Sequence, residues 1–305
     1  MTRHLGLDLG GTNVKMVVLE PGADGIPAVV ASRTAPTGAA GGPEAVADQL
    51  VALGRSMIED YGPVAGLGLG VPGLFDRDSG AIVLFPNLPG PWPGYPLRDR
   101  VGDGVGVPVS LINDARAFTL AEGTIGAGRG CRVLVCLTLG TGVGGGIMID
   151  GRLHLGSSGR AGEIAHQIIL PDGPLCGCGN RGCVEAVTRA DVLLEQAGRA
   201  TVEDVYLGVQ AGDERCLAAV AQVSEYLGIA IANTITLIGP ERVVVGGGIA
   251  QAGELALDPI RKAVWRHVTL VPAASVDIVA ASLGSQAGAI GAALAGSGQP
   301  PVRDR

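Results

Sequence analysis

The 305-residue sequence contains no uninterrupted apolar run of the roughly 20 residues that a membrane-spanning helix requires. Its first residues, MTRHLGLDLGG, lack the basic segment, the long apolar segment and the small-residue cleavage site of a secretory leader. Only 22 basic residues occur, they are scattered, and the formal net charge is −7, which argues against a nucleic-acid partner. We therefore expect a cytoplasmic protein with reduced thiols that binds neither a membrane nor a nucleic acid.

Charged residues make up only 17% of the chain and hydrophobic residues make up 47%, a balance that predicts a sizeable core. The length suits two lobes or one large α/β domain. The 51 glycines gather at the ends of apolar strands instead of forming a low-complexity linker. That placement indicates backbone that approaches a ligand closely.

Three segments, over residues 5–20, 133–151 and 242–255, share an apolar strand that ends in glycines. The first two continue into a second apolar strand, so each predicts a hairpin with a glycine-rich tip. Similar hairpins opening the two halves of the chain predict a duplicated domain with a cleft between the copies. The alternation of strands with helices predicts parallel sheets covered on both faces.

Apolar periodicity and turn residues place the remaining elements. We expect strands at 64–73, 107–112 and 275–280, and helices at 42–62, at 113–128, between about 184 and 238, at 258–268 and at 286–296. The tail at 297–305 is expected to fray.

The first hairpin turn carries groups that phosphate binding uses. Gly10, Gly11 and Thr12 offer unhindered backbone N–H groups and a hydroxyl to phosphate oxygens. Asp8, which ends the strand, is suited to hold Mg²⁺ or its water. Taken alone, the motif fits an ordinary hairpin with a solvated Asp equally well.

A second turn of the same type, LGTGVGGG from Leu139 to Gly146, favours the phosphate interpretation. Neither turn is followed by Gly-Lys-Ser/Thr, so neither is a Walker loop, and neither opens a helix as a dinucleotide fingerprint must. Two phosphate-type hairpins facing one cleft predict a nucleotide between two lobes.

Asp114 follows a buried strand and the polar Asn113. A carboxylate fixed where a strand ends and a helix starts can accept the proton of a substrate hydroxyl, as in phosphoryl transfer. It can equally cap the helix. Both functions are compatible if one of the two residues caps and the other acts on the substrate.

The segment CGCGNRGC places Cys176, Cys178 and Cys183 within eight positions. Cys176 and Cys178 are too close for an unstrained disulfide, and three is an odd number. With His166, ten residues upstream, they supply the Cys₃His set that structural zinc prefers. Plain buried thiols and a redox pair are the alternatives, and the remaining cysteines are expected in the core: Cys131, Cys136 and Cys216.

Two carboxylates flank the proposed metal. Glu163 precedes His166 by three residues and Glu185 follows Cys183 by two, so a metal-stiffened loop would hold both in fixed geometry for sugar hydroxyls. Solvated surface carboxylates are the alternative. Asn87, in the proline-rich FPNLPG, lies in a loop that could cover a cleft or simply form a turn.

Taken together, the motifs resemble the ROK family of bacterial sugar kinases, most closely its zinc-containing glucokinase branch. In the family's order, the likeness runs through DLGGTN, GVPG, PNL, NDA, AEGTIGAG, LGTGVGGG, GEIAH, CGCGNRGC followed by E, and VVVGGG. The combined histidine and cysteine signature is highly specific, whereas each glycine motif alone is not.

The resemblance implies an actin-like, ribonuclease-H-like two-domain α/β fold with a central cleft. It predicts a smaller domain over 1–114, completed by the helix near 286–296, and a larger domain over 115–285 that carries the zinc loop. It also implies ATP and Mg²⁺, a structural Zn²⁺ that shapes the pocket without joining in bond making, and a homodimer or homotetramer.

The same resemblance implies roles for individual residues. Asp114 would be the general base on the sugar 6-hydroxyl, and sugar contacts would come from Asn87, Asn113, Asp114, Glu163, His166 and Glu185. Nucleotide contacts would come from Asp8, Gly10, Gly11, Thr12, Asn13, Gly140, Thr141, Gly142, Gly246, Gly247 and Gly248. Glucose is the first choice of substrate, ahead of N-acetylglucosamine, N-acetylmannosamine, mannose and fructose.

Three departures from the family pattern bear on sugar and nucleotide preference: Arg116 beside the base, Ala165 before the histidine, and Thr188-Arg189-Ala190. Polyphosphate as donor is not favoured, because the sequence has no basic track. Family members that repress transcription carry an N-terminal helix-turn-helix, for which we expect the few residues preceding the first strand to leave no room. A sugar sensor without activity is therefore the weaker alternative.

Overall fold

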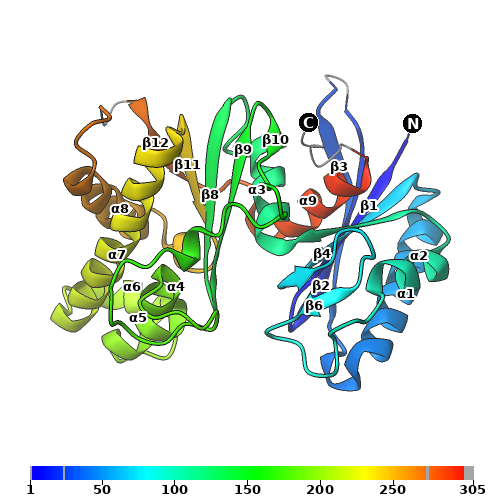
Figure 1. The fold of residues 1–305 in the computed structure, drawn as a ribbon, viewed down its shortest axis with the longest axis horizontal. Helices are drawn as coiled ribbons and strands as arrows, with labels where there is room; N and C mark the ends of the chain where they lie inside the picture. The colour runs from blue at the N-terminus through cyan, green and yellow to red at the C-terminus, as the bar shows by residue number, and fades with distance from the viewer. Residues whose placement is uncertain (1, 23–24, 273–274, 299–305) are drawn as a thin grey trace. The chain divides into compact units, whose positions relative to one another are not determined.

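The computed structural model describes residues 2–22, 25–272 and 275–298, and the chain forms two compact units. Unit 1 comprises Met1–Ile125 together with Ser285–Arg305, and unit 2 comprises Gly126–Gly284. Each unit is a mixed sheet packed against helices. Figure 1 colours these elements by their position along the chain. Helix α3 (Asp114–Thr124) lies in unit 1, so the predicted boundary after Asp114 comes too early in the chain.

Unit 1 contains a five-stranded sheet in the order β3-β2-β1-β4-β7. The parallel strands β1, β4 and β7 adjoin the antiparallel strands β2 and β3 at one edge. The sheet is therefore mixed, whereas the sequence predicted a parallel sheet. The initial hairpin requires this, because its two strands must run in opposite directions. The bounds are β1 (His4–Leu9), β2 (Asn13–Pro21), β3 (Pro27–Pro36), β4 (Gly66–Val71) and β7 (Val109–Asn113).

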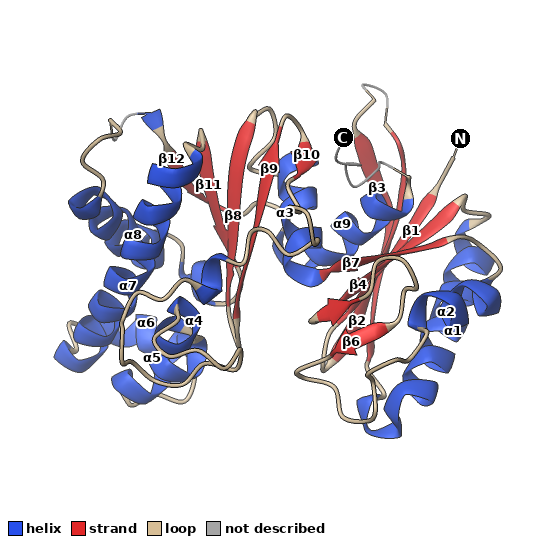
Figure 2. Ribbon diagram, viewed as in Figure 1, coloured by secondary structure: helices blue, strands red, loops and turns tan. Residues whose placement is uncertain are grey.

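Helix α9 (Ala287–Gly296) covers one face of this sheet (Figure 2). Glycines allow the backbone of α9 to approach the neighbouring backbones closely. A Cβ on Gly68 would lie 1.6 Å from the carbonyl oxygen of Ala292, well inside contact distance. A Cβ on Gly291 would lie 1.7 Å from the carbonyl oxygen of Ala117 in α3. Helix α9 is therefore held between the sheet and α3 at backbone contact.

The opposite face of the sheet buries the first core of unit 1 beneath α1 (Gly42–Tyr61) and α2 (Leu97–Val105). Leu5 and Leu7 of β1 are fully buried with Leu50 of α1. Alternation along β1 consequently places Gly6 and Asp8 on the α9 face. A small hairpin, β5 (Leu74–Phe75) with β6 (Ile82–Leu84), leads to a loop anchored by the buried Trp92.

Unit 2 repeats the pattern with the strand order β10-β9-β8-β11-β12. A hairpin of β8 and β9 again adjoins parallel strands, here β11 and β12. The strand bounds are β8 (Val133–Leu139), β9 (Val143–Ile149), β10 (Arg152–Leu153), β11 (Arg242–Gly246) and β12 (Asp277–Ala280). The helices are α4 (Val184–Thr188), α5 (Ala190–Ala197), α6 (Val202–Gln210), α7 (Glu214–Ile238) and α8 (Glu254–His267).

Helix α7 is the long core helix of unit 2, capped by Asp213, whose side chain accepts a hydrogen bond from the backbone of Cys216. Among the described helices it alone has the length and apolar composition of a membrane span, which the sequence-based expectation overlooked. In the structure, 56% of its most apolar 18-residue window is buried. Core helices commonly have this composition.

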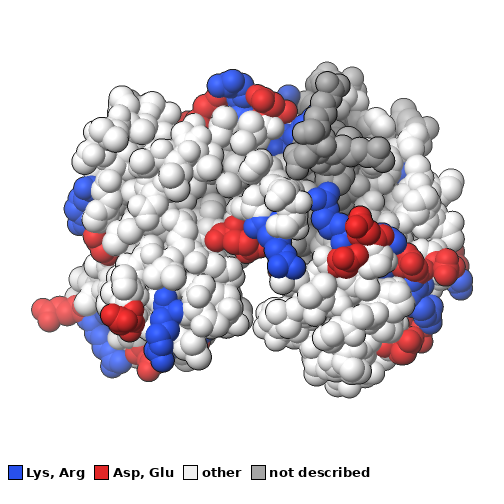
Figure 3. All heavy atoms as spheres, viewed as in Figure 1, with Lys and Arg blue, Asp and Glu red and all other residues white. Residues whose placement is uncertain are grey.

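Short 3₁₀ turns connect these elements: Ala39–Gly41, Ile164–His166, Ile249–Ala252 and Gly284–Gln286. The other predicted strands and helices fall within a few residues of the observed ones, whereas β3, β5, β6, β10 and α2 were not predicted. On the face drawn in Figure 3, basic and acidic side chains are intermingled. The predicted frayed tail lies largely outside the described residues, which end at 298.

The glycine contacts of α9 lead to a stability prediction. Gly68→Ala is expected to lower the free energy of unfolding by about 1–3 kcal/mol or more, because the added methyl overlaps the backbone of α9. Gly102→Ala, within α2, is the matched control, since its added Cβ would meet no atom closer than 3.7 Å. Urea unfolding followed by circular dichroism measures both, and equal stability of the two variants would contradict the packing described.

Candidate active site

In unit 1, the carboxyl ends of three parallel strands meet at one edge of the sheet. Asp8 of β1 pairs with Gly70 of β4, and Val71 pairs with Asn113 of β7. Side chains that follow these strands therefore gather at this edge, where the sheets of α/β proteins commonly bind ligands. The structure brings together there Asp8, Asn113 and Asp114, which the sequence separates by more than 100 residues.

The Asp8 carboxyl group occupies a niche that two glycines leave open. A Cβ on Gly288 would come within 2.3 Å of one carboxyl oxygen, and a Cβ on Gly70 within 3.2 Å of the other. Burial and the nearby charge of Asp114 raise the pKa of Asp8 to about 6, while Lys15 opposes the increase. The group is thus fixed in position and ionises near neutral pH.

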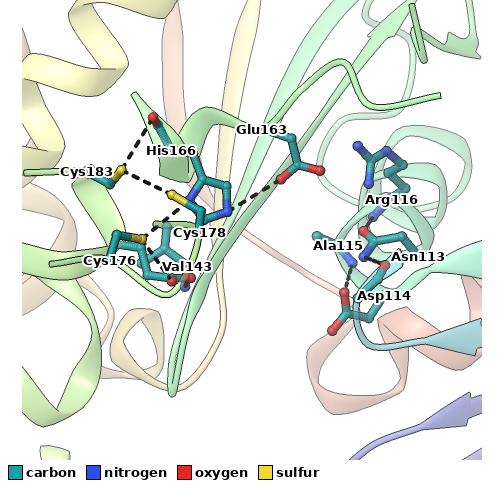
Figure 4. A network of polar contacts seen from close by, with 12 residues as sticks. Asn113, Asp114, Ala115, Arg116, Val143, Glu163, His166, Cys176, Cys178 and Cys183 are labelled. Carbon is teal, nitrogen blue, oxygen red and sulfur yellow. Dashed lines mark hydrogen bonds and ion pairs between the residues drawn. The ribbon is translucent and has the colours of Figure 1, made fainter. Parts of the chain in front are cut away.

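Of the two residues at the junction of β7 and α3, Asn113 provides the helix cap (Figure 4). Asn113 is the N-cap of α3, because its side chain accepts a hydrogen bond from the backbone N–H of Arg116 at 3.3 Å. Its amide nitrogen also donates to the carbonyl oxygen of Gly73 at 3.2 Å. Asp114 therefore stands in the first turn of α3, exposed, with one carboxyl oxygen accepting from the N–H of Ala115 at 2.8 Å.

The first glycine turn is closed by a hydrogen bond from Gly10 N–H to the carbonyl oxygen of Asn13 at 3.0 Å. Thr37, which follows β3, also stabilises this turn. Its hydroxyl donates a hydrogen bond to the carbonyl oxygen of Gly10 and its N–H donates one to the carbonyl oxygen of Thr12, each at 2.8 Å. The exposed tip, Gly11–Asn13, also adjoins Asn87, because a Cβ on Gly11 would lie 3.3 Å from the Asn87 carbonyl oxygen. The proline-rich loop thus lies beside the turn.

In unit 2, the four predicted metal ligands converge. The ligand atoms of His166, Cys176, Cys178 and Cys183 all lie within 4.8 Å of one another. The sulfurs of Cys178 and Cys183 are 3.6 Å apart, and Nδ1 of His166 lies 3.6 Å from the sulfur of Cys176 (Figure 4). Tetrahedral zinc with Zn–S bonds of about 2.3 Å places sulfurs roughly 3.7 Å apart, so these residues fit a zinc ion.

The protonation of Cys183 bears on metal binding, because only the thiolate form ligates a metal. Burial, reinforced by the neighbouring sulfurs, raises the pKa of Cys183 to about 12. Such a thiol remains protonated at neutral pH unless a cation stabilises the thiolate, as a bound metal does.

His166 ends the 3₁₀ turn beside the cysteines, and Glu163 directly precedes that turn. While Nδ1 of His166 faces Cys176, its Nε2 lies 4.0 Å from the carboxylate of the exposed Glu163. The next residue, Gln167, donates its side-chain amide to the hydroxyl of Thr234 in α7 at 3.1 Å. This anchor to the core helix was not predicted, because Gln167 and Thr234 are 67 positions apart.

Glu185 connects the cysteine segment to the second glycine turn. One carboxyl oxygen accepts from the N–H of Val143 at 3.2 Å, and the other lies 3.7 Å from the sulfur of Cys176. A Cβ on Gly142 would lie 3.1 Å from the same carboxylate. The carbonyl oxygen of Gly140 accepts from Ala190 N–H at 2.8 Å, so helices α4 and α5 fix the hairpin tip.

The third glycine motif follows β11. Gly246 ends the strand beside β8, and Gly247 has a φ of +88°. A Cβ on Gly247 would lie 2.4 Å from the carbonyl oxygen of Leu139. Glycine is required here both by the backbone conformation and by contact with the end of β8. The tip of the β8–β9 hairpin and this motif therefore share one edge of the unit 2 sheet.

Comparison with known proteins places this arrangement in a family. The sequence matches the ROK family over residues 4–296. It is 34% identical to a glucokinase of Thermotoga maritima, covering 95% of both chains, and 34% identical to an N-acetylmannosamine kinase of Escherichia coli O157:H7, covering 97% of this chain and 98% of that protein.

Solved structures agree. A ROK hexokinase from Thermus thermophilus has a TM-score of 0.82 and 34% identity, covering 97% of this chain and 98% of that one. A ROK glucokinase from Streptomyces griseus, in complex with glucose and AMPPNP, has a TM-score of 0.82 and 30% identity, covering 97% and 99%. The protein therefore belongs to the ROK family and has the actin-like, ribonuclease-H-like fold of its sugar kinases.

Proposed function

We propose that this sugar kinase transfers the γ-phosphoryl group of ATP to the 6-hydroxyl of a hexose, with glucose as the preferred substrate. The observation that carries the proposal is the division of labour between Asn113, which caps α3, and Asp114, which is left exposed beside it. The similarity to glucokinases over nearly the full length of both chains supports glucose.

In the proposed reaction, Asp114 accepts the proton of the sugar hydroxyl as its oxygen attacks the γ-phosphorus and the bond to ADP breaks. Backbone N–H groups of the two glycine turns, at 10–13 and 140–142, would hold the phosphate oxygens. Gly246, Gly247 and Gly248 would face the adenosine. Mg²⁺, when bound, neutralises phosphate charge, and Asp8 would hold it or its water.

Similarity to the family's sugar kinases supports six polar residues as the ones that would hold the sugar: Asn87, Asn113, Asp114, Glu163, His166 and Glu185. Zinc in the Cys₃His set would fix the loop that carries three of them and would take no part in bond making. The Glu163 carboxylate and His166 Nε2, 4.0 Å apart, are suited to neighbouring hydroxyls. We also propose a cytoplasmic homodimer or homotetramer.

The proposal is tested by measuring ATP-dependent ADP release with glucose, mannose, fructose, N-acetylglucosamine and N-acetylmannosamine, each against a blank without sugar. We expect glucose to give the highest kcat/KM. A higher value for another sugar would replace glucose and leave the kinase assignment intact. Activity on none of them would favour a sugar sensor.

Asp114→Asn is expected to lower kcat by about 10²-fold or more, because the amide cannot accept the hydroxyl proton. Asp99→Asn is the control, since Asp99 is also in the first turn of a unit 1 helix and its side chain is 59% exposed. Full turnover by the Asp114 variant, measured as ADP release at saturating substrates, would remove the general-base assignment.

Metal analysis of protein purified without chelator is expected to give about one zinc per chain. Cys178→Ser should lose the metal and lower the melting temperature, because the loop then loses its cross-link, whereas Cys131→Ser should retain both. The sugar KM should rise in the Cys178 variant. Clearly less than one zinc per chain in the unaltered protein would refute the Cys₃His site.

A further inference from the structure

Gln167 anchors the histidine end of the cysteine loop to the core helix of unit 2. Its side-chain amide donates to the hydroxyl of Thr234 at 3.1 Å and, more weakly, to the carbonyl oxygen of Ala230 at 3.5 Å. The Thr234 hydroxyl in turn donates to the same carbonyl oxygen at 2.8 Å. One amide, one hydroxyl and one carbonyl therefore form a connected set of hydrogen bonds against α7.

The backbone of Gln167 lies between two members of the metal-ligand set. Gln167 directly follows His166, and its carbonyl oxygen accepts from the N–H of Val184 at 3.0 Å. Val184 directly follows Cys183, and Ile168 pairs with Cys183 in an antiparallel bridge. A displacement of Gln167 would consequently move a histidine and a cysteine of the set together.

Anchoring the loop for stability alone does not require a polar pair. Ile164 and Ala165, on the 3₁₀ turn, are already buried in the core of unit 2. Thr234 is only 5% exposed, and a buried hydrogen bond adds little net stability because both of its groups give up water. A hydrogen bond nevertheless has a direction, so it selects one position among several that apolar packing would allow. The pair is therefore suited to fixing a position.

We propose that Gln167 is a positioning residue, whose bond to Thr234 holds His166 and Cys183 in place for the metal and His166 in place for the hexose. The inference rests on the proposed zinc site and kinase function, and it assigns a role to two residues outside both ligand sets. Ligands that are already in place bind more tightly, because less conformational entropy is lost on binding. Loss of the anchor therefore weakens the binding of both metal and sugar.

The competing explanation is that the pair only stabilises unit 2. Its loss would then lower the free energy of unfolding, without changing how fast the folded protein releases metal or how tightly it binds sugar. Helix α7 offers a matched control for this distinction. Thr236 is exposed, and its hydroxyl makes the same kind of bond within the helix, to the carbonyl oxygen of Ala232 at 2.9 Å.

Release of zinc from the loaded protein is measured in native buffer with a chromogenic chelator, pyridylazoresorcinol. Gln167→Leu, which keeps a side chain of similar bulk, is expected to release zinc about tenfold faster, as when groups that orient metal ligands are removed. Thr234→Val, which loses only the hydroxyl, should do the same. Thr234→Ser, which keeps the hydroxyl, and Thr236→Val should both match the wild type.

The double variant Gln167→Leu/Thr234→Val tests whether the bond itself is responsible. Each single substitution already removes the bond, so the two effects should not multiply. We expect zinc release about tenfold faster than in the wild type, as in each single variant. A roughly hundredfold increase would mean that the two residues act independently, which contradicts the proposal.

Steady-state kinetics provide a readout that does not depend on the chelator. In Gln167→Leu, the KM for sugar should rise about tenfold while the KM for ATP changes less than threefold, because the displaced loop carries His166 and Glu163. Thr234→Ser should keep the wild-type KM. Circular dichroism checks folding, and if Gln167→Leu does not fold, the comparison of Thr234→Val with Thr234→Ser tests the same bond from α7.

Wild-type zinc release by both Gln167→Leu and Thr234→Val would overturn the proposal, and so would equally fast release by Thr236→Val. A wild-type KM for sugar in Gln167→Leu would overturn the part that concerns the hexose. Protein that holds no zinc would overturn the proposal together with the Cys₃His site and leave the kinase function intact. Faster zinc release by Gln167→Leu, in a protein that phosphorylates no sugar, would support the anchor and refute the proposed reaction alone.

Discussion

The close approach of α9 to the sheet of unit 1 is the constraint on which the positions of Asp8 and Asp114 depend. It requires glycine at Gly6, Gly68 and Gly291, because a side chain at any of them would enter the backbone of the neighbouring element. In return, the start of α9 reaches the Asp8 carboxyl group, and α3 is held against α9 with Asp114 at its first turn. Packing that is invisible to hydrophobic patterning therefore sets the position of both carboxylates.

In unit 2, the positions of the polar side chains near the cysteines are set by contacts of a loop and not by helix packing. The segment from β10 to α4 has little regular structure, and its shape is set by four ligand atoms that converge and by single hydrogen bonds such as that of Gln167 to Thr234. Glu163 and His166 are thus carried on a loop, which a metal bound by the four ligand atoms would cross-link. Unit 1 therefore positions its carboxylates by dense backbone packing, whereas this segment of unit 2 depends on a cluster of potential metal ligands.

Local patterns were sufficient for the parts of this protein that depend on local chemistry. The CxC and later Cys spacing with His166, the two glycine hairpins and the strand–Asp114–helix junction were predicted from the sequence, and the structure brings the four metal ligands together. The edge strand β3 was not predicted, since most of its residues are exposed and lack an apolar face. The pairing of Lys15 with Asp8 and the double contact of Glu185 depend on register and on long-range packing, which no single segment encodes.

Glu185 contacts both the cysteine segment and the backbone of the second glycine hairpin through its two carboxyl oxygens. A side chain shared in this way links two equilibria. Any free energy by which a metal favours this position of Glu185 also favours the hairpin geometry, and by thermodynamic reciprocity a ligand that orders the hairpin must tighten the metal to the same degree. Through Glu185, a metal in the cysteine segment and a ligand at the hairpin would thus each strengthen the binding of the other.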